Sequence, residues 1–139
     1  MEESKLLSLI PQIAEIAKKN KWQTHYNESS DAFYWTKKKL SKKVKLIQFI
    51  DEFSLYVNSS GKIEGLFLEY AKFNFVDHHK EFKPLFRAMT HRVSADVYTI
   101  SKEKEDKVEH LLENIADKVA KETLRVVSKG ANIESLLSA

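Results

Sequence analysis

The sequence predicts a single α+β domain: a curved antiparallel sheet of about five strands, covered by an N-terminal helix and a long C-terminal helix. Three observations support this. Residues 44–76 form the longest run rich in β-branched and aromatic residues. Residues 3–20 carry apolar side chains at three- and four-residue spacing, and residues 102–128 repeat that spacing for about seven turns. The expected order of elements is α-β-β-β-β-α-β-α.

The run 44–76 is interpreted as three antiparallel strands separated by two turns. The turns are the charged pair at 51–52 and the segment Asn-Ser-Ser-Gly-Lys at 58–62, whose residues tolerate the left-handed backbone of a tight hairpin. Apolar and polar residues alternate from 53 to 58, which indicates one buried and one partly solvated face. The third strand, 63–75, is apolar on both faces. Gly65 within it indicates a bulge or a close approach of another backbone segment.

Two further strands are expected outside this run, at 32–36 and 95–100, because both segments are rich in strand-forming residues. Residues 23–31 are polar and predict a loop. Asp77 is expected to cap a short helix that places four apolar side chains on one side: Phe82, Leu85, Phe86 and Met89.

The ends of the helices follow from capping and proline rules. Pro11 interrupts the N-terminal stripe, so that helix either kinks there or gives way to a second helix. Pro84 raises the same choice in the helix after Asp77. Ser101 is an N-cap residue for the helix over 102–128, and Lys129–Gly130 would end it.

Length and composition predict an ordinary globular domain. The chain has 139 residues, of which 42% are hydrophobic and 31% charged, and it contains no cysteine. We expect one domain over residues 1–130 and a short tail over 131–139. The first apolar run, 6–10, lacks the basic flank and cleavage site of a signal peptide, and no run is long enough to cross a membrane. A cytoplasmic protein without a cofactor is therefore expected.

Positive charge is concentrated in one segment although the net charge is only +3. Residues 37–45 read KKKLSKKVK, and aromatic residues, Trp35 among them, precede this run. Phosphate-neutralising cations beside stacking rings are typical of single-stranded nucleic-acid platforms. Lysines at strand ends also protect a sheet against edge-to-edge aggregation, so both interpretations stay open. The candidate nucleic-acid residues are Trp35, Lys37, Lys38, Lys39, Lys42, Lys43 and Lys45.

A second candidate is an apolar interaction surface. The strand 63–75 is apolar on both faces, and the stripe of the last helix is wide, so part of this area could stay exposed after two helices cover the sheet. Its candidate residues are Tyr56, Leu66, Leu68, Tyr70, Leu112 and Val119. They would bind a protein partner or a second copy of the chain in a homodimer.

The third candidate is a metal or acid–base site in the segment Asp-His-His-Lys-Glu at 77–81. Imidazole and carboxylate groups would be the metal ligands of a cysteine-free protein. Adjacent residues of a helix point about 100° apart, so His78 and His79 do not easily face one ion, whereas His78 and Glu81 do. The alternative is a helix start with two half-exposed imidazoles.

Other catalytic signals are missing from the sequence. It contains no G-x-S-x-G motif and no cysteine nucleophile, and its three glycines are not clustered into a phosphate-binding loop. The preferred hypothesis is therefore a non-enzymatic binding or protein-interaction module. Nucleic-acid binding through Lys37–Lys45 is the alternative, and a metal-dependent hydrolase at His78, His79 and Glu81 is a distant third.

Overall fold

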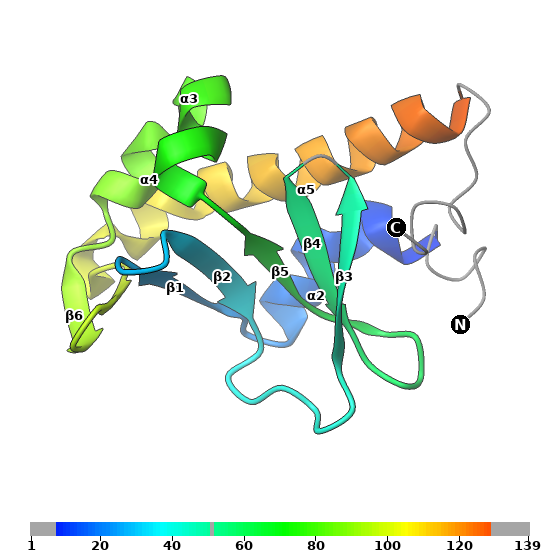
Figure 1. Ribbon diagram of the computed structural model, residues 1–139, viewed down its shortest axis with the longest axis horizontal. Helices are drawn as coiled ribbons and strands as arrows, with labels where there is room; N and C mark the ends of the chain where they lie inside the picture. The colour runs from blue at the N-terminus through cyan, green and yellow to red at the C-terminus, as the bar shows by residue number, and fades with distance from the viewer. Residues whose placement is uncertain (1–7, 51, 129–139) are drawn as a thin grey trace.

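A seven-stranded antiparallel sheet organises the structure, which is a computed structural model that describes residues 8–50 and 52–128 (Figure 1). The α+β class is confirmed, with seven strands in place of about five. The order across the sheet is β3-β4-β5-β2-β1-β7-β6. The strands are β1 (Gln23–Asn27), β2 (Ala32–Thr36), β3 (Lys45–Ile50), β4 (Phe53–Val57), β5 (Ile63–Leu68), β6 (His91–Ser94) and β7 (Val97–Thr99).

Within residues 8–50 and 52–128 the helices gather on one side of the sheet, and none of them covers its other face, which is called the open face (Figure 1). The α-helices are α2 (Ile13–Lys19), α3 (Val76–His78), α4 (Lys83–Arg87) and α5 (Glu105–Ser128). Tighter or wider turns adjoin them: η1 (Ile10–Gln12), η3 (Lys80–Phe82) and η4 (Lys102–Lys104) are 3₁₀ turns, and η2 (Ala71–Phe75) is a π-helical turn. The core lies between helices and sheet. Its fully buried side chains include Ile13, Phe33, Leu55, Leu66, Phe75 and Ile115.

The two extra strands lie at one end of the sheet. Residues 23–27 form β1 rather than the predicted loop, because Thr24 and Tyr26 are buried while β2 and β7 supply backbone partners on either side. β6 is the exposed edge strand, held by its hairpin pairing with β7. Neither β1 nor β6 has the continuous apolar run by which a strand is recognised in a sequence. β6 needs none, because it is stabilised by backbone pairing with β7 rather than by burial of its side chains.

The predicted strand 63–75 is too long: β5 ends at Leu68. The backbone reverses at Tyr70, whose φ of 53° is left-handed, and then enters η2. Asp31, in the turn between β1 and β2, fixes this reversal. Its carboxylate accepts hydrogen bonds from the amides of Lys72 at 2.9 Å and Phe73 at 3.0 Å, and its backbone oxygen accepts one from Ala71 at 2.8 Å.

Tyr26 is a further partner of Asp31, because its hydroxyl donates a hydrogen bond to the Asp31 carboxylate. Burial, together with this hydrogen bond, raises the pKa of Tyr26, so the phenol stays a neutral donor. The turn between β1 and β2 and the start of η2 are thereby joined through one buried carboxylate.

The two prolines behave differently. Pro11 lies inside η1, directly between helical residues 8–9 and α2, so it tightens one turn of the N-terminal helix. Pro84 lies in the first turn of α4. The backbone N–H groups there have no partner within the helix, so the missing N–H of proline costs no hydrogen bond. Asp77 lies inside α3 rather than at its N-cap, so the predicted cap is wrong. The four apolar residues predicted for this segment, Phe82, Leu85, Phe86 and Met89, are all buried.

The C-terminal helix matches its prediction. Ser101 is extended, and η4 and α5 follow it through Ser128. The Ser101 side chain makes no capping hydrogen bond; the backbone amide of Lys104 donates to the Ser101 carbonyl instead. The predicted stop at 129–130 and the tail 131–139 lie outside the described residues. Within the described ranges, no helix has the length and apolar character needed to cross a membrane.

Candidate functional site

The lysine-rich segment is a connection that crosses one end of the sheet. Residues 37–44 join β2 to β3, but β5 and β4 lie between those strands in the sheet. The connection therefore passes below the start of β5 and the end of β4, next to the turn at 58–62 (Figure 1). The basic residues are thus placed at the end of the sheet by topology.

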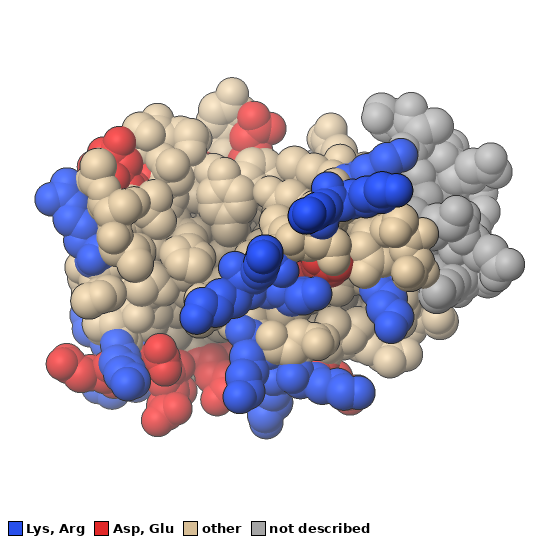
Figure 2. All heavy atoms as spheres, turned by 90° about the horizontal axis from the view of Figure 1, so that it is seen from below, with Lys and Arg blue, Asp and Glu red and all other residues tan. Residues whose placement is uncertain are grey.

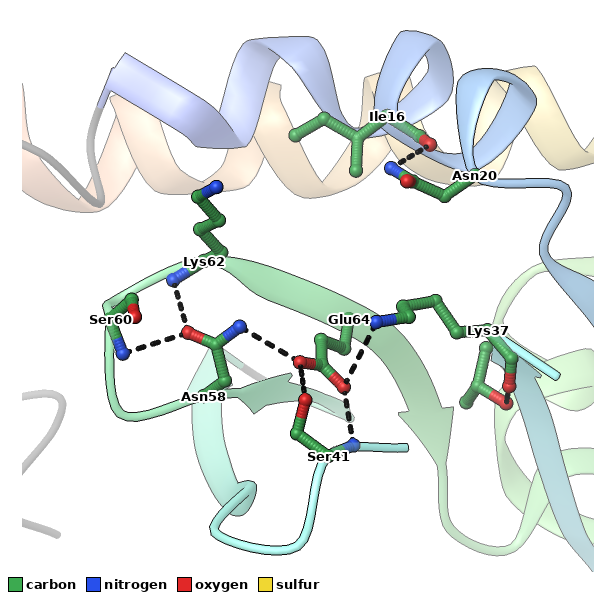
Figure 3. Close-up of polar contacts among 9 residues, drawn as sticks. Ile16, Asn20, Lys37, Ser41, Asn58, Ser60, Lys62 and Glu64 are labelled. Carbon is green, nitrogen blue, oxygen red and sulfur yellow. Dashed lines mark hydrogen bonds and ion pairs between the residues drawn. The ribbon is translucent and has the colours of Figure 1, made fainter. Parts of the chain in front are cut away.

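A buried glutamate holds this connection in place (Figure 3). Val57 pairs with Ile63 and Tyr56 pairs with Gly65, so Glu64 is the extra residue of a β-bulge in β5. Its carboxylate, only 2% exposed, accepts a hydrogen bond from the Ser41 amide at 2.8 Å and another from the Ser41 hydroxyl. The Asn58 side-chain amide donates to it at 2.8 Å, and the Lys37 ammonium lies 3.8 Å away. This set of contacts is the Glu64 anchor.

Asn58 extends the anchor to the neighbouring turn. Its side-chain oxygen accepts hydrogen bonds from the backbone amides of Ser60 at 2.9 Å and Lys62 at 3.0 Å. The lysine connection and the 58–62 turn are therefore fixed to one another through Glu64, as the dashed lines in Figure 3 show.

The Glu64 carboxylate is held in its ionised form. Burial by itself would raise the pKa of Glu64, but the hydrogen bonds from Ser41 and Asn58 and the charge of Lys37 outweigh it, so the pKa lies below its ordinary value of 4.5. A carboxylate that is buried yet ionised requires its partners, because an unpaired buried charge is costly.

Glu64→Gln is expected to lower the free energy of unfolding by about 1.5–3 kcal/mol near neutral pH, because hydrogen bonds to a charged acceptor become neutral ones. A depressed pKa in the folded state gives a stabilisation that is complete above the ordinary pKa and is lost as the pH falls through the folded value. The difference between wild type and variant should therefore shrink on acidification. Urea unfolding from about pH 7 to about pH 3 measures it.

Glu69→Gln is the matched control, because Glu69 is an exposed glutamate close to the other end of β5. It should change stability by no more than about 0.5 kcal/mol at neutral pH. A Glu64→Gln difference that stays constant across the pH series would contradict the assignment.

The remaining lysines of residues 37–45 are exposed to solvent. Lys38, Lys39, Lys42, Lys43 and Lys45 are exposed, and among the described residues no Asp or Glu forms an ion pair with them. Figure 2, which looks at the molecule from below, shows blue lysine and arginine side chains gathered across this end. The surface potential here is positive and is not cancelled locally.

The open face of the sheet begins directly beside these lysines. The strand registers place Leu46, Tyr56, Gly65 and Thr36 in one row across β3, β4, β5 and β2. The next row contains Gln48, Ser54, Phe67, Tyr34 and His25. Tyr34 and Phe67 contact each other with ring centroids 5.1 Å apart, and both are half-buried. Burial, followed by the nearby Tyr34 phenol, raises the pKa of Tyr56, which therefore carries no charge near neutral pH.

Trp35 does not belong to this face. It is 5% exposed, points into the core and meets Trp22 edge-to-face with ring centroids 5.4 Å apart. The strand β2 alternates, so its aromatic neighbour Tyr34 occupies the open face instead. The candidate nucleic-acid residues included Trp35 and not its neighbour Tyr34 or the more distant Phe67. The alternation in Ala32–Thr36 indicated that only one set of these rings could face solvent.

The predicted interaction surface is divided between core and exterior. Leu66, Leu68 and Val119 are fully buried, because the helices cover that face of the sheet, and they are not accessible to a partner. Tyr56 and Leu112 are half-buried. Tyr70 is 57% exposed, and Phe73, which was not predicted, is 79% exposed on the adjoining turn.

The histidine segment is tied to a residue that the sequence did not indicate. His78 Nδ1 lies 3.1 Å from one carboxylate oxygen of Glu52, and His79 Nε2 lies 3.2 Å from the other. Glu81, by comparison, is 4.0 Å from His79 Nδ1 and 3.8 Å from the Lys118 ammonium. In the part of the chain that the structure describes, no three His, Asp or Glu side chains are grouped to hold a metal ion.

Comparisons with known proteins add no relative: no protein-family model, no curated protein and no solved structure matches this chain.

Proposed function

We propose that this protein is a non-enzymatic binding protein that takes single-stranded nucleic acid across the lysine-bearing end of its open sheet face. The observation that supports this most is the Glu64 anchor, which fixes the basic connection beside the uncovered aromatic rows. An ordered row of cations costs less entropy on binding than a mobile loop would.

The two parts of this surface suit the two parts of a nucleotide. Phosphate groups would lie along the exposed lysines Lys38, Lys39 and Lys42, releasing counterions. Bases would stack near Tyr56 and Phe67, since rings accept any base on their faces. The Tyr56 phenol, whose pKa is raised by burial, would not repel the phosphates.

Binding should be lost when the lysines of the connection are reversed in charge. We expect a variant with Lys38→Glu, Lys39→Glu and Lys42→Glu to bind a labelled single-stranded oligonucleotide at least tenfold more weakly than wild type. The slope of the logarithm of the association constant against the logarithm of the salt concentration should become shallower by about 2. Fluorescence anisotropy over a series of salt concentrations measures both quantities.

The control reverses three exposed lysines elsewhere: Lys102→Glu, Lys104→Glu and Lys107→Glu, at the start of the last helix. It changes the net charge equally but leaves the connection intact. An equal loss of affinity in both triple variants would mean that binding depends on net charge alone and not on the lysine connection. Absence of salt-dependent binding by wild type would also refute the proposal.

A second candidate function is self-association through the turn around Tyr70 and Phe73. These two large apolar side chains are exposed and lie three positions apart in the chain, and exposed apolar area of this kind marks partner-binding sites. Native mass spectrometry distinguishes this candidate from the first, because it reports the mass of the assembly without nucleic acid.

A further inference from the structure

A cleft of about 540 Å³ lies on the helix side of the sheet, away from the lysine connection. Its walls come from the end of α2, the start of β1, the end of β7 and the first turns of α5. The volume falls within the range typical of small-molecule sites. Nothing in the proposed nucleic-acid surface uses it.

Both tryptophans of the chain line this cleft. Trp22 and Trp35 are largely buried, and together with Ile100 and Ala17 they give the cleft an apolar floor. The Trp22 indole nitrogen is buried and finds no hydrogen-bond acceptor in the described part of the chain. A buried donor without a partner costs about 1–3 kcal/mol, so an acceptor on a bound molecule would be favourable there.

One wall of the cleft is acidic. Glu105, Asp106, Glu109 and Glu113 line it from α5, and within the described ranges none of them forms an ion pair. Lys18 and Lys21 are the cations among the lining residues. His25 borders the cleft, although the strand register assigns its side chain to the open-face row with Tyr34. Burial lowers the pKa of His25, so it stays uncharged near neutral pH. Carboxylates therefore outnumber cations around the opening.

We propose that this cleft binds a small aryl-alkyl ammonium ion whose apolar end carries a hydrogen-bond acceptor. The ammonium group pairs with the α5 carboxylates, and the ring packs against the floor formed by the tryptophans in an offset or edge-to-face contact. The acceptor receives a hydrogen bond from the Trp22 indole N–H.

Tyramine is the probe, because it combines an ammonium group, a ring and a hydroxyl. Both tryptophans lie in the cleft, so their emission, excited where tyramine does not absorb, reports binding directly. Tyramine should change the emission saturably, phenethylamine should bind more weakly because it lacks the hydroxyl, and 3-(4-hydroxyphenyl)propionate should not bind, because its charge is negative. The variant Glu109→Gln with Glu113→Gln should weaken tyramine binding about tenfold.

Two further variants complete the test. Glu28→Gln with Glu103→Gln removes two exposed carboxylates outside the cleft and should leave the affinity unchanged. Trp22→Phe keeps the ring and removes the donor, so tyramine and phenethylamine should then bind equally, as read from Trp35. The proposal is overturned by a lack of saturable response to tyramine, by equal responses to the ammonium and the carboxylate probes, or by unchanged affinity in Glu109→Gln with Glu113→Gln.

Discussion

Phe75→Ala is expected to lower the free energy of unfolding by about 3–5 kcal/mol. Phe75 is fully buried at the end of η2 and packs between three rings. Its ring centroid lies 5.6 Å from that of Phe53, 5.4 Å from that of Phe82 and 4.7 Å from that of His79. Alanine would leave a cavity where the sheet, η2 and η3 meet, and these elements cannot all collapse into it.

Urea unfolding of wild type and variant at one temperature measures the difference. Phe73→Ala is the matched control, because Phe73 belongs to the same turn but is 79% exposed. That control should change the free energy of unfolding by about 0.5 kcal/mol or less. Similar losses in the two variants would mean that the turn is not packed as described.

Gly65→Ala is expected to destabilise the protein by about 3 kcal/mol, the upper end of the range for overpacking. A Cβ atom at this position would lie 2.4 Å from Thr36 Cγ2, 2.8 Å from Thr36 Cβ and 3.0 Å from Thr36 Cα. The last contact is with backbone, so rotating the threonine side chain cannot relieve it. β2 and β5 would have to separate at the pair Thr36 and Gly65.

A double-mutant cycle isolates this clash. Thr36→Gly removes the two closest atoms, and by itself it should cost about 1 kcal/mol through backbone entropy. In that background Gly65→Ala should cost at least about 1 kcal/mol less than it does in wild type. Strictly additive effects would show that the close approach of the two strands is not the cause.

The local sequence pattern was sufficient to predict a helix or strand wherever that element buries a regular stripe of apolar residues. The helix over 102–128 has a repeated apolar spacing, and β4 alternates cleanly at Phe53, Leu55 and Val57, so both could be placed from sequence. Gly65 was interpreted as a bulge or a close approach. It makes the close approach, to Thr36, whereas the bulge lies at the preceding residue, Glu64. These features depend on neighbours in the chain or on glycine itself.

Features that depend on distant residues could not be placed. Residues 71–75 have a strand-like composition, yet they form η2. The amides at its start donate hydrogen bonds to Asp31, which lies forty-one positions before Lys72. Glu52 and its two histidines, like Glu64 and Ser41, are also more than twenty positions apart in sequence. The lysines of the candidate site were found because their charge is local. The residues that position them were not.

The place of β2 in the sheet has a consequence for how the chain assembles. The strands β3, β4 and β5 pair with their neighbours in sequence, and so do β1 and β2. Among the described strands, the pairing of β2 with β5 joins these two parts of the sheet. Forming it closes a long loop that includes all six lysines of residues 37–45, whose mutual repulsion adds to the entropy of closure. Glu64 belongs to β5 and lies beside Lys37, where this loop closes. The pairing of β5 with β2 therefore also brings in the negative charge of Glu64, which offsets part of the repulsion between the lysines.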